Sequence, residues 1–413
     1  MRLLDTCELI VDCEHKTAPT QAEGYPSIRT PNIGRGRFLL DGVNRVSEAT
    51  YRAWTARAIP SPGDLIMARE APVGNVAMVP PGLVPCLGQR TLLIRPDHRR
   101  ISAAYLTYLL LSPQVQGSIH AKTNGATVAH LNMKDVRELE LPPLPPLNEQ
   151  RRIAAILSAY DDLIENCERR IRLLDEMARA LYREWFVLFR YPGHEKTPLV
   201  DSRNGRIPKA WEYKPLSSLT SKIGSGATPR GGKEAYQRDG ISLIRSLNVY
   251  DDHFDLNNLA FISDEQARQL DNVAVERFDV LLNITGASVA RCAMVPANVL
   301  PARVNQHVAI LRADRVHMDP HLLLDSINSE QNKAKLLALA QGGATREALT
   351  RETISRFEIL VPSPQLVHRY GQIAASSYAE RENLRSQVDN LRKTRDLLLP
   401  RLLSGQLSLK DAA

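Results

Sequence analysis

Residues 148–188 have the sequence NEQRRIAAILSAYDDLIENCERRIRLLDEMARALYREWFVL, which contains no proline and no glycine. As a single α-helix this stretch would be about 60 Å long. Asn148 follows Pro145-Pro146 and is a favourable N-cap residue, and Tyr191-Pro192-Gly193 ends the helix on the other side. We therefore expect the fold to be built around one unusually long helix.

Apolar residues recur along this helix at steps of three and four, with one irregularity at Cys167, and form a heptad seam. The seam residues are Ile153, Ile156, Tyr160, Leu163, Cys167, Ile171, Leu174, Ala178, Leu181 and Trp185. A core helix of an ordinary domain is the alternative, but such helices average three to four turns. A long single seam needs a cover, which would be a second helix or another protein. We predict partner binding at Ile153, Ile156, Tyr160, Ile171, Leu174, Leu181 and Trp185.

The C-terminal region supplies a candidate for the covering helix. Residues 365–399 carry apolar residues at similar spacing among charged ones. Pro400 then interrupts the pattern, and Ser404-Gly405 ends it. We expect a second long helix here that pairs with the first.

The composition is that of a globular protein with two or three domains in 413 residues, 43% of them hydrophobic and 24% charged. The N-terminal residues lack the apolar core of a signal peptide, and no apolar run reaches transmembrane length. The five cysteines are odd in number and scattered, which favours free thiols in a reducing cytoplasm. The net charge of +7 is compatible with a polyanionic partner but does not require one.

The segments on either side of the long helix resemble each other in four collinear blocks. The paired blocks are 27–33 with 243–249, 63–80 with 278–296, 88–97 with 305–314, and 124–147 with 342–366. The blocks 63–80 and 278–296 end in the same Ala-Met-Val-Pro. The last block of each segment, 124–147 or 342–366, leads into a long helix. Because the offset drifts only from about 215 to 220 residues, we interpret the chain as an internal duplication.

Short apolar runs within each segment predict strands, for example at 65–67, 75–79 and 91–94, and helices are expected at 102–111 and 320–340. The expected fold class is α/β (α+β), with two similar globular domains and two long helices. The expected boundaries are 1–146 for the first domain, 147–190 for the central helix, 191–206 for a linker, 207–363 for the second domain and 364–408 for the C-terminal helix.

No catalytic signature is present in the sequence. The glycine-rich stretch 224–233 lacks Walker A spacing, and Cys7, Cys13 and His15 match no familiar zinc pattern. We expect no metal site and no cofactor bound by this chain, so that catalysis would come from a partner.

The remaining polar signal lies in loops that carry arginine, asparagine, threonine and lysine at matching places in both repeats. Such side chains suit base edges, although each alone is more often a turn former or a solvated surface residue. The candidate DNA-binding residues are Arg29, Thr30, Asn32, Arg35, Arg37, Arg69, Asn75, Lys122, Asn124, Thr127, Lys233, Arg245, Ser246, Asn248, Asn283, Thr285, Ser288, Arg291, Thr345 and Arg346.

Three stretches together resemble a known family. LPPLPPLNEQRRIAAILSAYDDLIENCERRIRLLDEMARALYREWFV (141–187), IPKAWEYKPLSSL (207–219) and LRKTRDLLLPRLLSGQLSL (391–409) are similar to segments of specificity subunits of type I restriction-modification enzymes. The N-terminus departs from the pattern because the first repeat lacks the Pro-x-x-Trp start found at 208–211, so its first strand is expected to be shorter.

The resemblance implies two globular target-recognition domains separated by two long antiparallel helices, which form a coiled-coil-like spacer. It also implies a DNA-binding subunit without catalysis of its own, whose two domains each recognise half of a bipartite site in double-stranded DNA. It also implies two methyltransferase subunits that use S-adenosylmethionine and, where present, two restriction subunits that use ATP and Mg²⁺. Two other readings stay open, which are a protein-binding scaffold organised by the paired helices and a stand-alone DNA enzyme with an unrecognised site.

Overall fold

The computed structural model describes residues 1–123, 130–341 and 347–407. The chain forms two compact units, of which the first comprises Met1–Asn166 with Gln387–Ala413 and the second comprises Cys167–Ser386. Each of the two long helices contributes one part to each unit.

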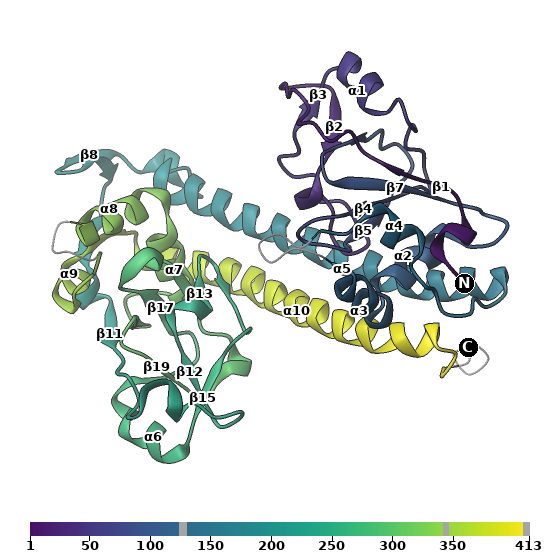
Figure 1. The fold of residues 1–413 in the computed structure, drawn as a ribbon. Coiled ribbons are helices and arrows are strands. Elements are labelled where there is room, and N and C mark those ends of the chain that lie inside the picture. The colour runs from purple at the N-terminus through teal and green to yellow at the C-terminus, as the bar shows by residue number, and fades with distance from the viewer. Residues whose placement is uncertain (124–129, 342–346, 408–413) are drawn as a thin grey trace. The chain divides into compact units, whose positions relative to one another are not determined.

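The first unit is built on an antiparallel sheet in the order β1-β7-β4-β5 (Figure 1). Its side chains alternate between two apolar layers, because successive residues of a strand point to opposite faces. Leu65, Met67 and Ile94 pack against helices, whereas Ile66 and Leu93 pack toward a smaller sheet, β3-β2-β6. The strands are β1 (Cys7–Asp12), β2 (Tyr25–Ile28), β3 (Arg45–Val46), β4 (Leu65–Ala68), β5 (Val76–Met78), β6 (Cys86–Leu87) and β7 (Thr91–Pro96).

Helices α2 (Ala103–Leu111), α3 (Pro113–Ala121) and α4 (Met133–Arg137) pack on one face of this sheet and precede the long helix α5 (Leu147–Tyr182). Helix α1 (Glu48–Trp54) lies instead beside β6 of the smaller sheet. The helix predicted at 102–111 corresponds to α2, whereas α3 was not predicted. The break between them falls at Ser112, whose hydroxyl accepts a hydrogen bond from the Val115 amide at the start of α3.

The second unit repeats this topology with β11-β20-β17-β18 as its main sheet and β15-β12-β19-β16 as its smaller one. Two-stranded pairs β8-β9, β10-β21 and β13-β14 complete it. The strands are β8 (Leu199–Ser202), β9 (Gly205–Pro208), β10 (Glu212–Pro215), β11 (Thr220–Ser225), β12 (Ile241–Ile244), β13 (Val249–Tyr250), β14 (His253–Phe254), β15 (Ala260–Ile262), β16 (Ala274–Val275), β17 (Val280–Asn283), β18 (Cys292–Met294), β19 (Ala302–Val304), β20 (Val308–Ala313) and β21 (Glu358–Val361). The helices are α6 (Asp264–Gln269), α7 (Pro320–Asn328), α8 (Glu330–Gln341), α9 (Arg351–Arg356) and α10 (Pro364–Leu403).

One buried ion pair occurs identically in both units. The Arg95 guanidinium of β7 donates Nε to Asp64 Oδ1 (2.9 Å) and Nη2 to Oδ2 (2.7 Å). Arg312 of β20 makes the same two contacts with Asp279, both at 2.8 Å. The shared strand order and this shared pair bear out the duplication, and the predicted fold class is confirmed.

Several predicted element boundaries need correction. The helix expected at 320–340 is divided into α7 and α8 at Ser329, whose hydroxyl donates to the Ser326 carbonyl. Pro400 lies within α10, which continues to Leu403 and ends before Ser404-Gly405, as expected. The segment 191–206, expected as a linker, contains β8, and its Tyr191 ring stacks on Trp211 at 5.1 Å.

The shorter start of the first repeat is also visible. In the second unit β10 pairs with β21 over four residues, whereas the corresponding place in the first unit has the isolated bridge Arg2–Glu140.

The apolar seam of α5 differs in phase from the predicted one. Leu157 and Ile164 are 0% and 3% exposed, whereas Leu163 is 54% exposed. Replacing Ile156 and Leu163 by Leu157 and Ile164 gives alternating steps of four and three residues from Ile153 to Trp185. The irregularity predicted at Cys167 is therefore absent, and the helix follows a regular heptad pattern.

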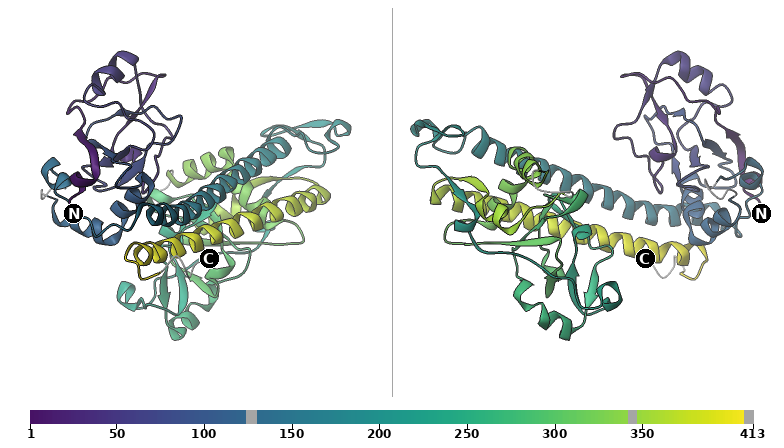
Figure 2. Two further views of the ribbon diagram at one scale, coloured as in Figure 1. Left: turned by 90° about the vertical axis from the view of Figure 1, so that its right-hand side faces the viewer. Right: turned by 60° about the vertical axis from the view of Figure 1, so that its left-hand side comes forward.

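Within each unit the segments of α5 and α10 lie antiparallel (Figure 2). An ion pair also joins the two helices in each unit. In the first unit Arg395 Nη1 lies 2.5 Å from Asp161 Oδ1. In the second unit Arg381 Nη1 lies 2.6 Å from Asp175 Oδ1, and Arg381 is only 5% exposed. Both arginines occupy seam positions of α10, so the seam is bound by charge as well as by apolar contact.

Candidate nucleic-acid interface

The ends of the central strands form an equivalent backbone frame in both units. In the first unit the Arg69 amide donates to the Arg90 carbonyl (3.0 Å), and the Leu131 amide donates to the Arg69 carbonyl (3.0 Å). In the second unit the Ile284 amide donates to the His307 carbonyl (3.0 Å), and the Leu349 amide donates to the Ile284 carbonyl (2.8 Å). Arg69 therefore corresponds to Ile284, and Arg90 corresponds to His307.

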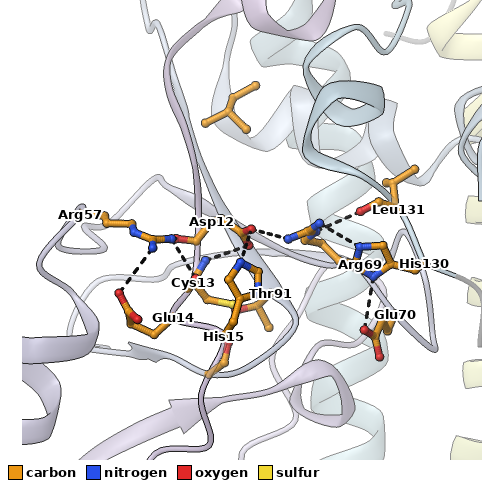
Figure 3. Close-up of polar contacts among 12 residues, drawn as sticks. Asp12, Cys13, Glu14, His15, Arg57, Arg69, Glu70, Thr91, His130 and Leu131 are labelled. Atoms are coloured by element: carbon orange, nitrogen blue, oxygen red, sulfur yellow. Dashed lines mark hydrogen bonds and ion pairs between the residues drawn. The ribbon is translucent and has the colours of Figure 1, made fainter.

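The first unit fills this frame with charged side chains (Figure 3). Arg69 is 5% exposed and lies between Asp12 and His130, with Nη1 2.5 Å from Asp12 Oδ2 and Nη2 3.0 Å from His130 Nε2. Its Nε donates to the Leu131 carbonyl. Glu70 lies 3.3 Å from His130 and 2.9 Å from Arg90. The guanidinium group of Arg69 is therefore bound to partners inside the protein.

The second unit fills the same frame with smaller and mostly uncharged groups. Ile284 stands in the place of Arg69 and is 8% exposed. Thr285 corresponds to Glu70, and its hydroxyl lies 2.6 Å from His307 Nδ1. The two units thus share a backbone arrangement at these strand ends and differ in the side chains that they place there.

Several predicted DNA-binding residues instead hold loops in place. The Asn32 side-chain oxygen accepts from the Arg29 amide, and its nitrogen donates to the Leu39 carbonyl. Asn248 makes the corresponding contacts with the Arg245 amide and the Asp255 carbonyl, and it is 0% exposed. This repeated motif explains why SIRTPNI and LIRSLNV match, and it removes Asn248 from contact with a ligand in this conformation.

Asn75 and Asn283 tie these loops to the main sheet. Asn75 Nδ2 donates to the Ile33 carbonyl (2.9 Å), and Asn283 Nδ2 donates to the Val249 carbonyl (3.1 Å). Asn283 is 0% exposed. Asn248, Asn283 and Arg69, three of the predicted DNA-binding residues, are therefore buried in internal contacts in this structure.

Other predicted residues lie nearer to solvent. Arg29, Arg35 and Arg37 are exposed, although Arg35 Nη2 also donates to the Leu111 carbonyl. Thr30 is 9% exposed, and the partly exposed candidates are Lys122, Ser246, Thr285, Ser288, Arg245 and Arg291. The Arg245 and Arg291 guanidinium groups stack over the Tyr236 and Tyr250 rings. Asn124, Thr127, Thr345, Arg346 and the side chain of Lys233 lie outside the described part of the structure.

Sequence reasoning missed Arg90, His307 and Glu70. The signal was present, because GQR and NQH occupy the same place in one pair of matching blocks. The blocks were interpreted as strands, so the residues that precede each strand were not considered as a site.

The predicted partner-binding residues of α5 face the protein itself. Ile153 belongs to the core of the first unit, and Trp185 belongs to the core of the second. Ile156, Tyr160, Ile171, Leu174 and Leu181 are partly buried. The exposed apolar residues of this helix are Leu163, Leu173 and Met177.

The cysteines have the properties of buried structural thiols. Burial raises the pKa of Cys7 to about 11 and raises that of Cys13 above its ordinary value. Among the residues that the structure describes, no group of three metal-ligating side chains is found. No helix in the described ranges is long and apolar enough to cross a membrane.

Comparison with known proteins places these features in a family. A family model described as the type I restriction modification DNA specificity domain matches residues 7–175. The MjaIX specificity subunit from Methanocaldococcus jannaschii is 23% identical over 379 residues, covering 91% of this chain and 84% of that protein. The HindI specificity subunit from Haemophilus influenzae is 23% identical over 455 residues, covering 93% of this chain and 95% of that protein.

A solved structure has the same fold. The crystal structure of the type I restriction-modification S subunit from M. genitalium superposes with a TM-score of 0.65 at 14% identity, covering 97% of this chain and 95% of that one. The resemblance to type I specificity subunits is therefore confirmed by a family model that matches residues 7–175 and by relatives that align with most of the chain.

Proposed function

We propose that this chain is the DNA-recognition subunit of a type I restriction-modification enzyme and that its two domains recognise the two halves of a bipartite site. One observation carries this proposal, which is that both domains share a strand-end frame but place different side chains on it. A duplicated scaffold with diverged strand ends suits two different half-sites separated by DNA of unspecified sequence.

The reaction would be supplied by partners. The proposed complex contains two methyltransferase subunits that use S-adenosylmethionine to methylate adenine and, where present, two restriction subunits that use ATP and Mg²⁺. The exposed Leu163, Leu173 and Met177 offer apolar area on α5 for docking of such partners. We expect the purified chain alone to transfer no methyl group from labelled S-adenosylmethionine to duplex DNA. Transfer by the chain alone would assign catalysis to it and contradict this division of roles.

The deciding experiment is a comparison of methylated DNA motifs in the host genome before and after deletion of this chain. We expect one bipartite adenine-methylated motif to disappear on deletion and to return when the intact chain is supplied again. If every methylated motif persists after deletion, the protein-binding scaffold becomes the better account.

A further inference from the structure

We propose that Arg90 and His307, each with its neighbour across the strand end, are equivalent base-reading positions of the two domains. This inference rests on the proposed function and deepens it, because it names the residues that make the two half-sites differ. Neither position stood out in the sequence as a candidate for contact with DNA.

Backbone hydrogen bonds place Arg90 and His307 at equivalent positions, and the contacts of their side chains are equivalent too. Arg90 and His307 each precede a central strand, β7 or β20, and each accepts a hydrogen bond from the residue at the end of the neighbouring strand. Each side chain also contacts the residue that follows this hydrogen-bond donor in the chain. Arg90 Nη1 lies 2.9 Å from Glu70 Oε2, and His307 Nδ1 lies 2.6 Å from the Thr285 hydroxyl. The same two places thus form a contacting pair in both domains.

These pairs contribute little to the fold. The Arg90 side chain is 55% exposed, whereas that of its partner Glu70 is 16% exposed, and an ion pair with a solvent-exposed member typically adds little to stability. The second domain builds the same frame with His307 and Thr285, so the charges at 70 and 90 are not needed for it. A reason other than stability is therefore required for an arginine and a glutamate here.

The layer beneath the first pair holds it in place. Arg69 is buried between Asp12 and His130, and His130 in turn contacts Glu70 at 3.3 Å. Arg69 is thus a positioning residue, since it acts on Glu70 through His130 and does not reach the surface. Glu70 is held from two sides, by His130 and by Arg90, which leaves a pre-organised pair facing solvent.

The chemistry of each pair suits a different base pair. Arginine donates two hydrogen bonds to guanine O6 and N7, and glutamate accepts one from cytosine N4, so Arg90 with Glu70 fits a G·C pair. Thr285 offers a methyl group that suits the thymine methyl, and the adjacent Gln306 suits adenine N6 and N7. The second domain therefore favours A·T at its corresponding position.

The test uses the full-length chain assembled with its methylating partners and a duplex library randomised over both half-sites. For Arg90→Ala we expect the G·C preference at one position of one half-site to fall by about 5- to 150-fold, with the other half-site unchanged. Arg90→Lys keeps the charge but not the paired donors, so it should lose the same preference. The matched control is Arg99→Ala, which removes an 86% exposed arginine beyond the other end of β7 and should change no preference.

Substitutions in the second domain test the inference independently in the same selection experiment. His307→Ala should relax one position of the other half-site, and His317→Ala, a 60% exposed histidine beyond the far end of β20, should not. The double variant Glu70→Thr/Arg90→His installs the second domain's pair and should move the first domain's preference from G·C toward A·T.

Equal loss of binding to all sequences for Arg90→Ala and Arg99→Ala would show charge attraction alone and overturn the inference. Unchanged half-sites for Arg90→Ala and His307→Ala would overturn it as well. Failure of the wild-type complex to select any bipartite sequence would instead reject the proposed function itself.

Discussion

Arg69 at the end of β4 and Ile284 at the end of β17 occupy the same backbone position, yet one is a buried cation and the other a buried hydrocarbon. The side chains that surround these two residues differ as well. Asp12 and His130 surround Arg69, whereas the corresponding positions in the second domain are Ser225 and Ala348. Two solutions to one packing problem therefore exist within a single chain.

Transplanting one solution into the other domain gives a stability prediction. Arg69→Ile alone leaves Asp12 without its main partner and should cost about 3 kcal/mol, because removing one member of a buried pair is strongly destabilising. The triple variant Asp12→Ser/Arg69→Ile/His130→Ala copies the second domain and should recover most of this loss. Urea denaturation of the full chain measures both, and a triple variant no more stable than the single one would contradict the prediction.

The corrected seam of α5 can be checked by substituting the adjacent residues Leu163 and Ile164. Ile164→Glu buries a charge in the seam and should destabilise the protein by several kcal/mol, whereas Leu163→Glu should change stability by less than about 0.5 kcal/mol. Thermal unfolding distinguishes them. If Leu163→Glu folds normally but fails to assemble with methylating subunits in light scattering, Leu163 belongs to the docking surface. Equal destabilisation by both substitutions would restore the seam first drawn from the sequence.

The second unit contains a partly buried acid that should make its stability depend on pH. Burial raises the pKa of Asp325 to about 7, from an ordinary value of 3.8, and the Tyr370 hydroxyl donates to this carboxyl group at 2.6 Å. Because the folded-state pKa is the higher one, the unfolded chain ionises first as the pH rises. Stability should therefore fall between about pH 4 and 7, by at most about 1.4 kcal/mol per pH unit, and level off above pH 7.

Asp325→Asn should flatten this part of the pH profile. Denaturation can be followed by tryptophan fluorescence in a Trp54→Phe background, in which Trp185 and Trp211 both report on the second unit. Asp239→Asn, at an exposed acid of the same unit, is the control and should keep the wild-type slope. An unchanged slope in Asp325→Asn would show that this carboxyl group ionises normally in the folded protein.

The end of α10 should be required by the first unit and dispensable for the second. Leu399 and Leu402 are 7% and 3% exposed in the core that contains Leu65 and Ile94. Leu402→Asp should therefore unfold the first unit at lower denaturant concentration, reported by Trp54 in a Trp185→Phe/Trp211→Phe background. The second unit should unfold as in wild type, and a loss of both together would mean that the units share one cooperative transition.

The sequence predicted periodic features well and placed individual side chains less well. The heptad period of α5 was evident, but adjacent apolar residues such as Leu163 and Ile164 leave the phase of a helix open by about 100°. Asn248 and Asn283 were interpreted as surface residues because asparagine usually is exposed. Their burial depends on backbone carbonyls that only the tertiary fold brings near. Arg90 was missed because its partner Glu70 is 20 residues earlier in the chain.

The placement of Leu399 and Leu402 in the first unit also sets an order of events on the ribosome. The second unit is one continuous stretch and can close as soon as residue 386 has emerged, whereas the first must wait for residues 387–407, although its other part was made first. The delay between synthesis of residue 166 and synthesis of residue 387 is roughly 10 to 45 s at ordinary rates of translation. During this time the apolar face of the first unit stays uncovered. A premature stop late in the gene would therefore damage the domain encoded at its beginning.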